Sequence, residues 1–304
     1  MNGIINVCKN TGQSSFDVVA KIRRYAKEKK VGHTGTLDPE ASGVLPVCLG
    51  KATKIIEYIM ENKKVYRVTF KLGVITTTYD LEGEVIKENS IENVKEEDII
   101  KTIGEFKGEI EQVPPMYSAL KKDGVRLYEL ARKGIEVERE ARKITINSIE
   151  NIEINLPYIT MDVSCSKGTY IRSLCYDIGE KLKVGATMTA LVRIANGEFK
   201  IENSVNIKDL NEENVEEYIL TLEDALVDFP KFEVDDNFKK LLINGVCVGN
   251  NKIYKGKKLE VEKLYRVYDE KNNLLGLGKR TEKGFKIEKM LIWGEVNDSS
   301  RWKF

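Results

Sequence analysis

The stretch from Gly32 to Leu45, GHTGTLDPEASGVL, contains the residues best suited to chemistry. It holds His33, the only histidine of the chain, and Asp38, which comes five residues later and directly before Pro39. The proline restricts Asp38 to extended backbone geometry, and the glycines of the stretch allow sharp turns and close backbone approach. A rigid loop that holds one carboxylate suits a nucleophilic aspartate, although Asp-Pro and glycine are also ordinary turn residues.

Arg172 is the second candidate. The segment ITMDVSCS predicts a strand that ends near Ser166, and KGTYIRSLCYDIGEKL predicts a helix that begins near Tyr170, so Arg172 falls in its first turn. A cation there opposes the helix dipole, and a buried partner carboxylate would offset this cost. Tyr170, at the same corner, offers an aromatic face or a hydroxyl. The structural alternatives are a solvated arginine and a core tyrosine.

Several other classes of chemistry are excluded or disfavoured. The chain has no G-x-x-x-x-G-K-[ST] motif, and no G-x-G-x-x-G follows a strand and opens a helix. The DLEGE segment at Asp80 is similar to a calcium loop, but its glycine comes too early, so we interpret it as a strand turn. The five cysteines form no C-x-x-C pair, which predicts buried reduced thiols rather than disulfides or a zinc site. We therefore expect no metal.

The elements that must position these residues alternate helix and strand periods. Residues 14–30 predict a helix that opens with a Ser14–Asp17 capping box and buries Phe16, Val19, Ala20 and Ile22. Residues 65–73 predict a strand with one face formed by Tyr66, Val68, Phe70 and Leu72, and GEVIKE, residues 83–88, is expected to pair with it. EEDIIKTIGEF predicts a helix, and KITINSI and NIEINL predict two further strands.

Charge is distributed unevenly behind a net charge of +1. Residues 115–143 carry eight basic and five acidic residues, with Lys121, Lys122 and Arg126 forming a basic turn before a short helix. Residues 198–230 carry ten acidic and two basic residues and are expected to be a helix-like connector. Residues 239–289 carry 14 basic and six acidic residues, and Asn272-Asn273 predicts a hairpin turn there. The charge pattern indicates a polyanion-binding module after an acidic connector, or alternatively a lysine-rich solvated surface. Short strands such as those in KLEVEKLYRVYDEKNNLLGLGKR, residues 258–280, indicate a small, mostly β domain.

Several segments, in this order and over about residues 1–200, resemble a known family. They are GHTGTLDPEASGVLPVCLG, KKVYRVTFKLG, PPMYSALKKDGVRLYELARKGIEVERE, SKGTYIRSL and MTALVRIANGEF. Together they resemble the bacterial tRNA pseudouridine-55 synthases of the TruB family. The C-terminal part resembles a PUA-type RNA-binding domain, with a weaker match.

The resemblance implies an α+β fold with a mixed, mainly antiparallel central sheet and flanking helices. It implies a catalytic domain at 1–228, with an RNA-gripping insertion at about 115–143, and a small β-rich PUA-like domain at 229–304. The insertion is expected to be mobile without RNA and to order on binding. The resemblance implies that Asp38 is the nucleophile and that Arg172 pairs with it. Tyr66 would pack on the base and is a candidate acceptor of the C5 proton, Tyr170 and Leu191 would line the pocket, and His33 would fill the space left by flipped-out nucleotides. The implied RNA-binding residues are Lys121, Lys122 and Arg126.

The implied activity is the isomerisation of uridine to pseudouridine in the T-loop of tRNA, by base flipping and without a cofactor. Asp38 attacks C6 of the base or C1′ of the sugar, or it assists elimination; the sequence leaves all three open. The T-arm of tRNA is the expected partner, and we expect a monomer without an obligate protein partner. The absence of an export signal and of a membrane-length apolar run predicts a cytoplasmic protein. The alternatives are a tRNA-folding chaperone with secondary or absent isomerase activity, and a guide-dependent relative with another RNA target.

Overall fold

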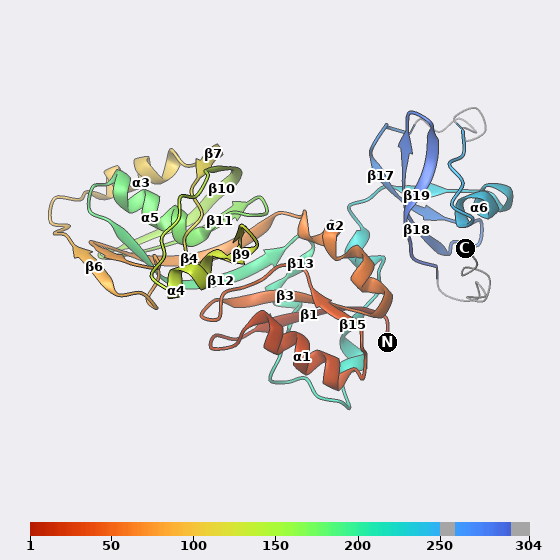
Figure 1. The fold of residues 1–304 in the computed structure, drawn as a ribbon, viewed down its shortest axis with the longest axis horizontal. Coiled ribbons are helices and arrows are strands. Elements are labelled where there is room, and N and C mark those ends of the chain that lie inside the picture. Colours follow the sequence, from red (N-terminus) through yellow and green to blue (C-terminus); the bar gives the residue numbers. More distant parts are fainter. Residues whose placement is uncertain (250–258, 293–304) are drawn as a thin grey trace.

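The computed structural model describes residues 1–249 and 259–292 (Figure 1). Within these ranges the chain forms a larger body around an 11-stranded sheet and a smaller C-terminal body around a four-stranded sheet. None of the helices in the described residues combines the length and the apolar character needed to cross a membrane. The α+β class and the small β-rich C-terminal unit predicted from the sequence are confirmed.

The large sheet is mixed and mainly antiparallel, as predicted. Its main path runs β14-β1-β3-β12-β4-β11-β10-β7, and β1/β14 and β3/β12 are the parallel pairs on that path. The strands of this path are β1 (Gly3–Lys9), β3 (Ser42–Leu49), β4 (Lys64–Leu72), β7 (Gly108–Gln112), β10 (Arg142–Asn155), β11 (Tyr158–Cys165), β12 (Ala186–Asn196) and β14 (Val205–Asn206). Pairing beside the path are β2 (Val31–His33), β13 (Phe199–Lys200) and β15 (Ile219–Leu220).

The helices flank this sheet or connect its strands. They are α1 (Ser15–Tyr25), α2 (Ile56–Met60), α3 (Glu96–Gly104), α4 (Leu127–Arg132), α5 (Ile171–Lys181) and, in the C-terminal body, α6 (Asp236–Ile243). The described residues also form the short 3-10 helices η1 (Gly50–Ile55), η2 (Ile201–Asn203), η3 (Val215–Tyr218) and η4 (Asp224–Leu226).

Helix α1 begins where the sequence predicted, but its buried face is rotated. The Ser14–Asp17 capping box is present. The buried residues are Ser15, Val18, Val19 and Ile22, whereas Ala20 is exposed and the Phe16 side chain is 65% exposed. Ser15 faces inward, where its hydroxyl bonds to the backbone of Leu37. Phe16, about 100° further round the helix, lies outside the stripe formed by the buried residues.

Three other expectations about elements were wrong. Strand β6 (Val85–Glu88) pairs with β5 (Val74–Thr76) rather than with β4, because both edges of β4 are occupied by β11 and β12. The two strands expected in KITINSI and NIEINL are the single strand β10, bent where its register with β11 shifts. Residues 198–230 form no α-helix in the structure, only 3-10 turns and short strands, two of which pair with β1.

The C-terminal sheet has the order β16-β17-β18-β19, from β16 (Lys231–Glu233), β17 (Leu264–Tyr268), β18 (Leu274–Thr281) and β19 (Gly284–Met290). The predicted Asn-Asn turn joins β17 to β18, with Asn272 at φ 60°. An apolar cluster joins the two bodies, with Ile4 and Ile55 from one and Leu277 and Leu291 from the other. The part of the basic segment at 250–258 and the end of the chain at 293–304 lie outside the described residues.

The cysteines are free thiols within this fold, as expected, but they are not all buried. Cys48, Cys165 and Cys175 are buried, Cys8 is half-buried and Cys247 is exposed. Cys247 departs from the prediction because it lies after the end of α6, outside the core of the C-terminal body.

Candidate active site

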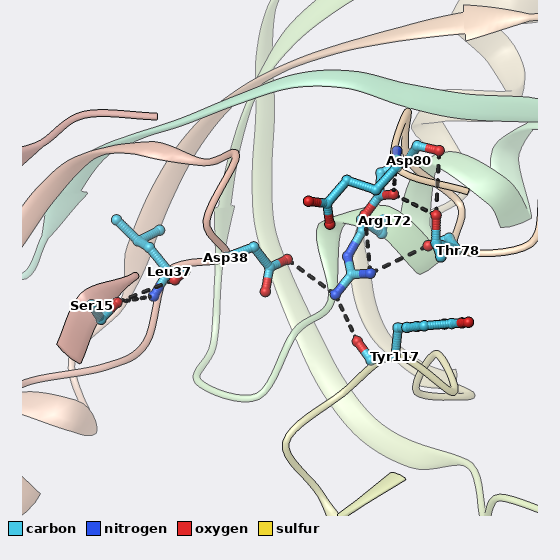
Figure 2. Close-up of polar contacts among 8 residues, drawn as sticks. Ser15, Leu37, Asp38, Thr78, Asp80, Tyr117 and Arg172 are labelled. Atoms are coloured by element: carbon cyan, nitrogen blue, oxygen red, sulfur yellow. Dashed lines mark hydrogen bonds and ion pairs between the residues drawn. The ribbon is translucent and has the colours of Figure 1, made fainter. Parts of the chain in front are cut away.

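Asp38 lies in the loop between β2 and β3, and that loop is anchored on both sides of it. Before Asp38, Leu37 donates its N–H to Ser15 Oγ at 2.9 Å and accepts from the same hydroxyl at 3.1 Å (Figure 2). After it, the carbonyl of Pro39 accepts from Lys9 Nζ at 3.0 Å. Burial lowers the pKa of Lys9 to about 8. These contacts hold the Asp38 backbone in one position, which is the preorganisation that a reacting carboxylate requires.

Arg172 projects from the first turn of α5 and meets four oxygen atoms (Figure 2). Its Nη2 lies 3.0 Å from Oδ2 of Asp38 and donates to the carbonyl of Tyr117 at 2.8 Å. Its Nη1 lies 3.1 Å from Oδ2 of Asp80 and donates to the carbonyl of Thr78 at 3.3 Å. The Arg172 side chain is only 7% exposed. The guanidinium therefore joins three segments that are distant in sequence, and the contact between Arg172 and Asp38 expected from the sequence is present.

Asp80 is the member of this network that the sequence reasoning missed. Its Oδ1 accepts from the Thr78 hydroxyl and, at 3.1 Å, from the N–H of Glu82. The same carboxylate therefore stabilises the turn through Oδ1 and pairs with Arg172 through Oδ2. The segment is a strand turn, as interpreted. Nothing local in TTTYDLEGE indicates that the turn faces Asp38, because that depends on the packing of β5 beside β12 and on the bridge between Asp80 and Met188 of β12.

A cavity of about 220 Å³ opens beside Asp38. Its lining includes Asp38, Asp80, Leu81, Met188 and Leu191. Leu191 is buried in the wall, as a pocket residue would be, and the Asp38 side chain is 43% exposed. Within the part of the chain that the structure describes, the contact with Arg172 is made by Oδ2 of Asp38, and Oδ1 accepts no hydrogen bond (Figure 2).

Tyr66 lies on β4 directly opposite Arg193 on β12. Arg193 is 1% exposed and donates to Val44 O at 2.7 Å and to Gly35 O at 3.0 Å. Burial raises the pKa of the Tyr66 hydroxyl, and the nearby Arg193 guanidinium opposes that rise. Arg193 is thus a second buried cation of the site. The sequence analysis did not identify Arg193 as a site residue, because it is a single cation within the apolar strand segment ALVRIANG.

Close packing against Arg193 explains why residue 43, near the start of β3, is a glycine. Gly43 has a φ of +103°, and a Cβ there would lie 2.2 Å from the carbonyl oxygen of Arg193. Only glycine allows β3 and β12 to approach this closely beside the site.

His33 ends β2, and its Nδ1 accepts from the N–H of Gly35 at 3.2 Å. Burial, assisted by Arg193, lowers the pKa of His33. The ring meets Phe16 edge-on, with centroids 5.8 Å apart and planes at 85°. The histidine is therefore a neutral aromatic ring on the helix α1 side of the loop.

Tyr170 forms the N-cap of α5, two residues before Arg172. Its backbone N–H donates to Gln112 Oε1 at 2.8 Å, and its carbonyl accepts from Gln112 Nε2 at 3.0 Å. Burial raises the pKa of the Tyr170 hydroxyl. The side chain of Gln112, from β7, thus fixes the corner at which α5 begins.

The basic insertion at 115–143 contacts Arg172 through Tyr117, near its first residue, and not through its basic hairpin. The hairpin consists of β8 (Lys121–Lys122) and β9 (Val125–Arg126). Lys121 and Lys122 are exposed, and Arg126 lies over the ring of Tyr128 at 5.8 Å. The insertion therefore meets the site where the Tyr117 carbonyl accepts from Arg172.

Comparisons with known proteins agree with this fold. The family model "TruB family pseudouridylate synthase (N terminal domain)" matches residues 23–171, and the model "tRNA pseudouridylate synthase B C-terminal domain" matches residues 172–227. The fold and the two family models therefore define a pseudouridylate synthase. The chain belongs to the TruB family.

Individual relatives extend the match to nearly the whole chain. A protein of Clostridium perfringens (strain SM101 / Type A) named tRNA pseudouridine synthase B is 67% identical, over 96% of this chain and 99% of the relative. One of the same name from Clostridium tetani is 54% identical, over 96% of this chain and 100% of the relative. Among solved structures, an H/ACA RNP bound to a substrate RNA containing 2'-deoxyuridine is similar, with a TM-score of 0.71, 28% identity and coverage of 96% of this chain and 85% of that chain.

Proposed function

We propose that this chain is a tRNA pseudouridine synthase that isomerises uridine-55 in the T-loop. The observation that carries the proposal is Asp38, held on an anchored loop and paired with the buried Arg172 at the mouth of a cavity. The name shared by its close relatives supports tRNA as the substrate.

The reaction breaks the N1–C1′ bond of uridine, turns the base and joins C5 to C1′. The hydrogen leaves C5 and N1 takes up a proton, so the change is an isomerisation without electron transfer and needs no cofactor. Asp38 acts as the nucleophile through its unpaired Oδ1. Addition to C6, addition to C1′ and assistance to elimination toward a glycal are the three roles that this position allows.

The surrounding residues bind and orient the base. Arg172 fixes the Asp38 carboxylate, and Tyr66 packs on the uracil and is the candidate acceptor of the C5 proton. The Arg193 guanidinium near Tyr66 opposes part of the rise in the pKa of the phenol that burial causes. Tyr170 and Leu191 complete an aromatic and apolar slot around the base.

A base within folded RNA must leave its stack to reach Asp38, which costs a few kcal/mol. We assign His33 to the space that the extruded nucleotides leave, where a neutral ring replaces stacking. Lys121, Lys122 and Arg126 bind phosphates, as does the C-terminal domain. We place the catalytic domain at 1–228 and the PUA-like domain at 229–304, and propose that the enzyme acts in the cytoplasm as a monomer without an obligate protein partner.

Tritium release from a tRNA transcript that carries 5-³H-uridine tests this proposal. Wild type should release tritium, Asp38→Asn should not, and a transcript with cytidine at the T-loop target should abolish release from that site. Tight tRNA binding by wild type without release would contradict the proposal and favour the chaperone, whose activity should survive Asp38→Asn. Release that persists with the cytidine transcript would indicate another target.

A further inference from the structure

The outward face of α1 carries an aromatic side chain followed by a row of basic ones. At helical spacing from Phe16, the exposed residues of the helix are Ala20, Arg23 and Arg24, and the exposed Lys27 follows two residues after the helix ends at Tyr25. Over residues 20–30 the chain has six basic residues and one acidic residue, Glu28. The Glu28 carboxylate is occupied by the N-terminal amino group of Met1, at 3.0 Å. The helix therefore presents concentrated positive charge to solvent.

Phe16 connects this face to the active-site loop. Its side chain is 65% exposed although it belongs to a large apolar residue, and its ring packs edge-on against His33. Most of the Phe16 side chain therefore stays open to solvent beside His33. The burial of Val18, Val19 and Ile22 anchors the helix, so the position of Phe16 is fixed by its neighbours.

The charges of this face are available for a polyanion. Arg23 is exposed, and Arg24 lies over the ring of Tyr25 at 5.1 Å, an arrangement that keeps its charge. Lys27 has one ion pair, with Glu212 at 3.3 Å, in which both side chains are largely exposed. Exposed pairs of this kind contribute little to stability, so Lys27 can exchange its partner at low cost. The carboxylate of Asp17, the one nearest in sequence to Phe16, accepts from the N–H and the hydroxyl of Ser14 in the capping box.

We propose that this face, Phe16 with Arg23, Arg24 and Lys27, is a second RNA-binding surface beside the active site. Phe16 stacks on an unpaired base next to the extruded uridine, and the three basic side chains bind the phosphates of the strand that leads away from it. Charge complementarity commits the surface to RNA, since arginines and lysines bind phosphates and an exposed aromatic ring stacks on any base. The inference rests on the proposed function, and it adds a binding surface separate from the basic hairpin.

Binding of the T-arm stem-loop at a series of salt concentrations tests the basic residues. The variant Arg23→Ala/Arg24→Ala/Lys27→Ala should bind at least about tenfold more weakly at low salt, and the slope of log K against log salt should fall by roughly 2, since each phosphate that is no longer neutralised removes about 0.7–0.9. The matched control is Lys95→Ala/Lys101→Ala/Lys107→Ala, which removes three exposed lysines in and around α3 at another end of the larger body (Figure 1).

A Phe16 series tests stacking separately from charge. Phe16→Ala and Phe16→Leu should both weaken binding by about tenfold, whereas Phe16→Tyr should bind like wild type, because stacking needs an aromatic face rather than apolar volume. Thermal unfolding should be unchanged in all three, since the side chain is exposed.

The outcomes separate this inference from the proposed function. If wild type releases tritium but the α1 triple variant keeps the affinity and salt slope of the α3 control, the RNA surface is overturned. An α1 face that served an acidic protein instead would give that same result. Loss of affinity with Phe16→Tyr as large as with Phe16→Leu would overturn the stacking role. Absence of tritium release by wild type would contradict the proposed function instead.

Discussion

The Arg172 centre and the basic hairpin both use cations, but in opposite environments. Arg172 is buried and meets oxygen atoms from Asp38, Asp80, Thr78 and Tyr117, so its position is determined by many partners. The lysines of the hairpin at 121–126 are exposed on two-residue strands. A buried charge must be fully paired to be tolerated, and the same pairing makes it precise enough for chemistry. An exposed charge stays free to follow a flexible phosphate chain.

The largest effect should come from Arg172. Arg172→Lys keeps the charge but loses the planar fork that reaches Asp38 and Asp80 together. We expect turnover to fall by about 10²–10³-fold, the range seen when one electrostatic interaction in an active site is removed, while tRNA affinity changes little. Single-turnover tritium release and equilibrium binding measure the two quantities. If Arg172→Lys weakened tRNA binding without lowering turnover, Arg172 would act as the hairpin cations are expected to act, and the contrast between the two regions would be wrong.

Asp80→Asn should have the next largest effect. The amide keeps the size of the side chain but removes the charge paired with Nη1, so Arg172 is oriented less strictly toward Asp38. Turnover should fall by roughly 10-fold, equivalent to about 1.4 kcal/mol. Glu84→Gln, on the same turn, is the matched control because Glu84 is exposed and contacts Thr77 through its backbone N–H and carbonyl. Equal losses in the two variants would indicate a general disturbance of the turn.

Removal of the hairpin charges should act on binding instead. Lys121→Ala/Lys122→Ala/Arg126→Ala is expected to weaken tRNA binding and to flatten its salt dependence, by about 0.7–0.9 in slope for each phosphate that the variant no longer binds. Single-turnover release at saturating enzyme should remain close to that of wild type. Unchanged affinity and slope would show that the hairpin is not an RNA grip.

The smallest effect is expected at Asp177, where a partly buried carboxylate without an ion pair in the described part of the chain should lower the free energy of unfolding when it is charged. Asp177 lies on α5, like Arg172, but has no ion pair among the described residues, and burial raises its pKa to about 6. Its stabilising protonated form is therefore complete below the unfolded value near 3.8 and is lost as the pH rises through about 6. Asp177→Asn should raise Tm at pH 7.5, by an amount corresponding to roughly 1–2 kcal/mol, and should raise it less at pH 5. An equal gain at both pH values would exclude titration as the cause.

Much of the local structure was predictable because it depends on neighbours in the chain. The capping box of α1, the alternation along β4 and the Asn272 turn rest on contacts within a few residues. The same is true of the loop at Asp38, whose glycines and proline indicate a fixed backbone. The errors, such as the pairing of β6 and the acidic segment at 198–230, concern segments whose partners are chosen elsewhere in the chain.

The sequence by itself therefore determined the family, the carboxylate that we propose as the nucleophile, and the local elements that present it. Only the tertiary structure decided which groups surround that carboxylate. Asp80 and Tyr117 meet Arg172 across large separations in sequence, and Arg193 lies beside Tyr66 because β12 pairs with β4. The exposure of Phe16 follows from which side of α1 faces the sheet. Periodicity and capping act over one helical turn, whereas burial and ion pairing depend on the order in which the strands assemble.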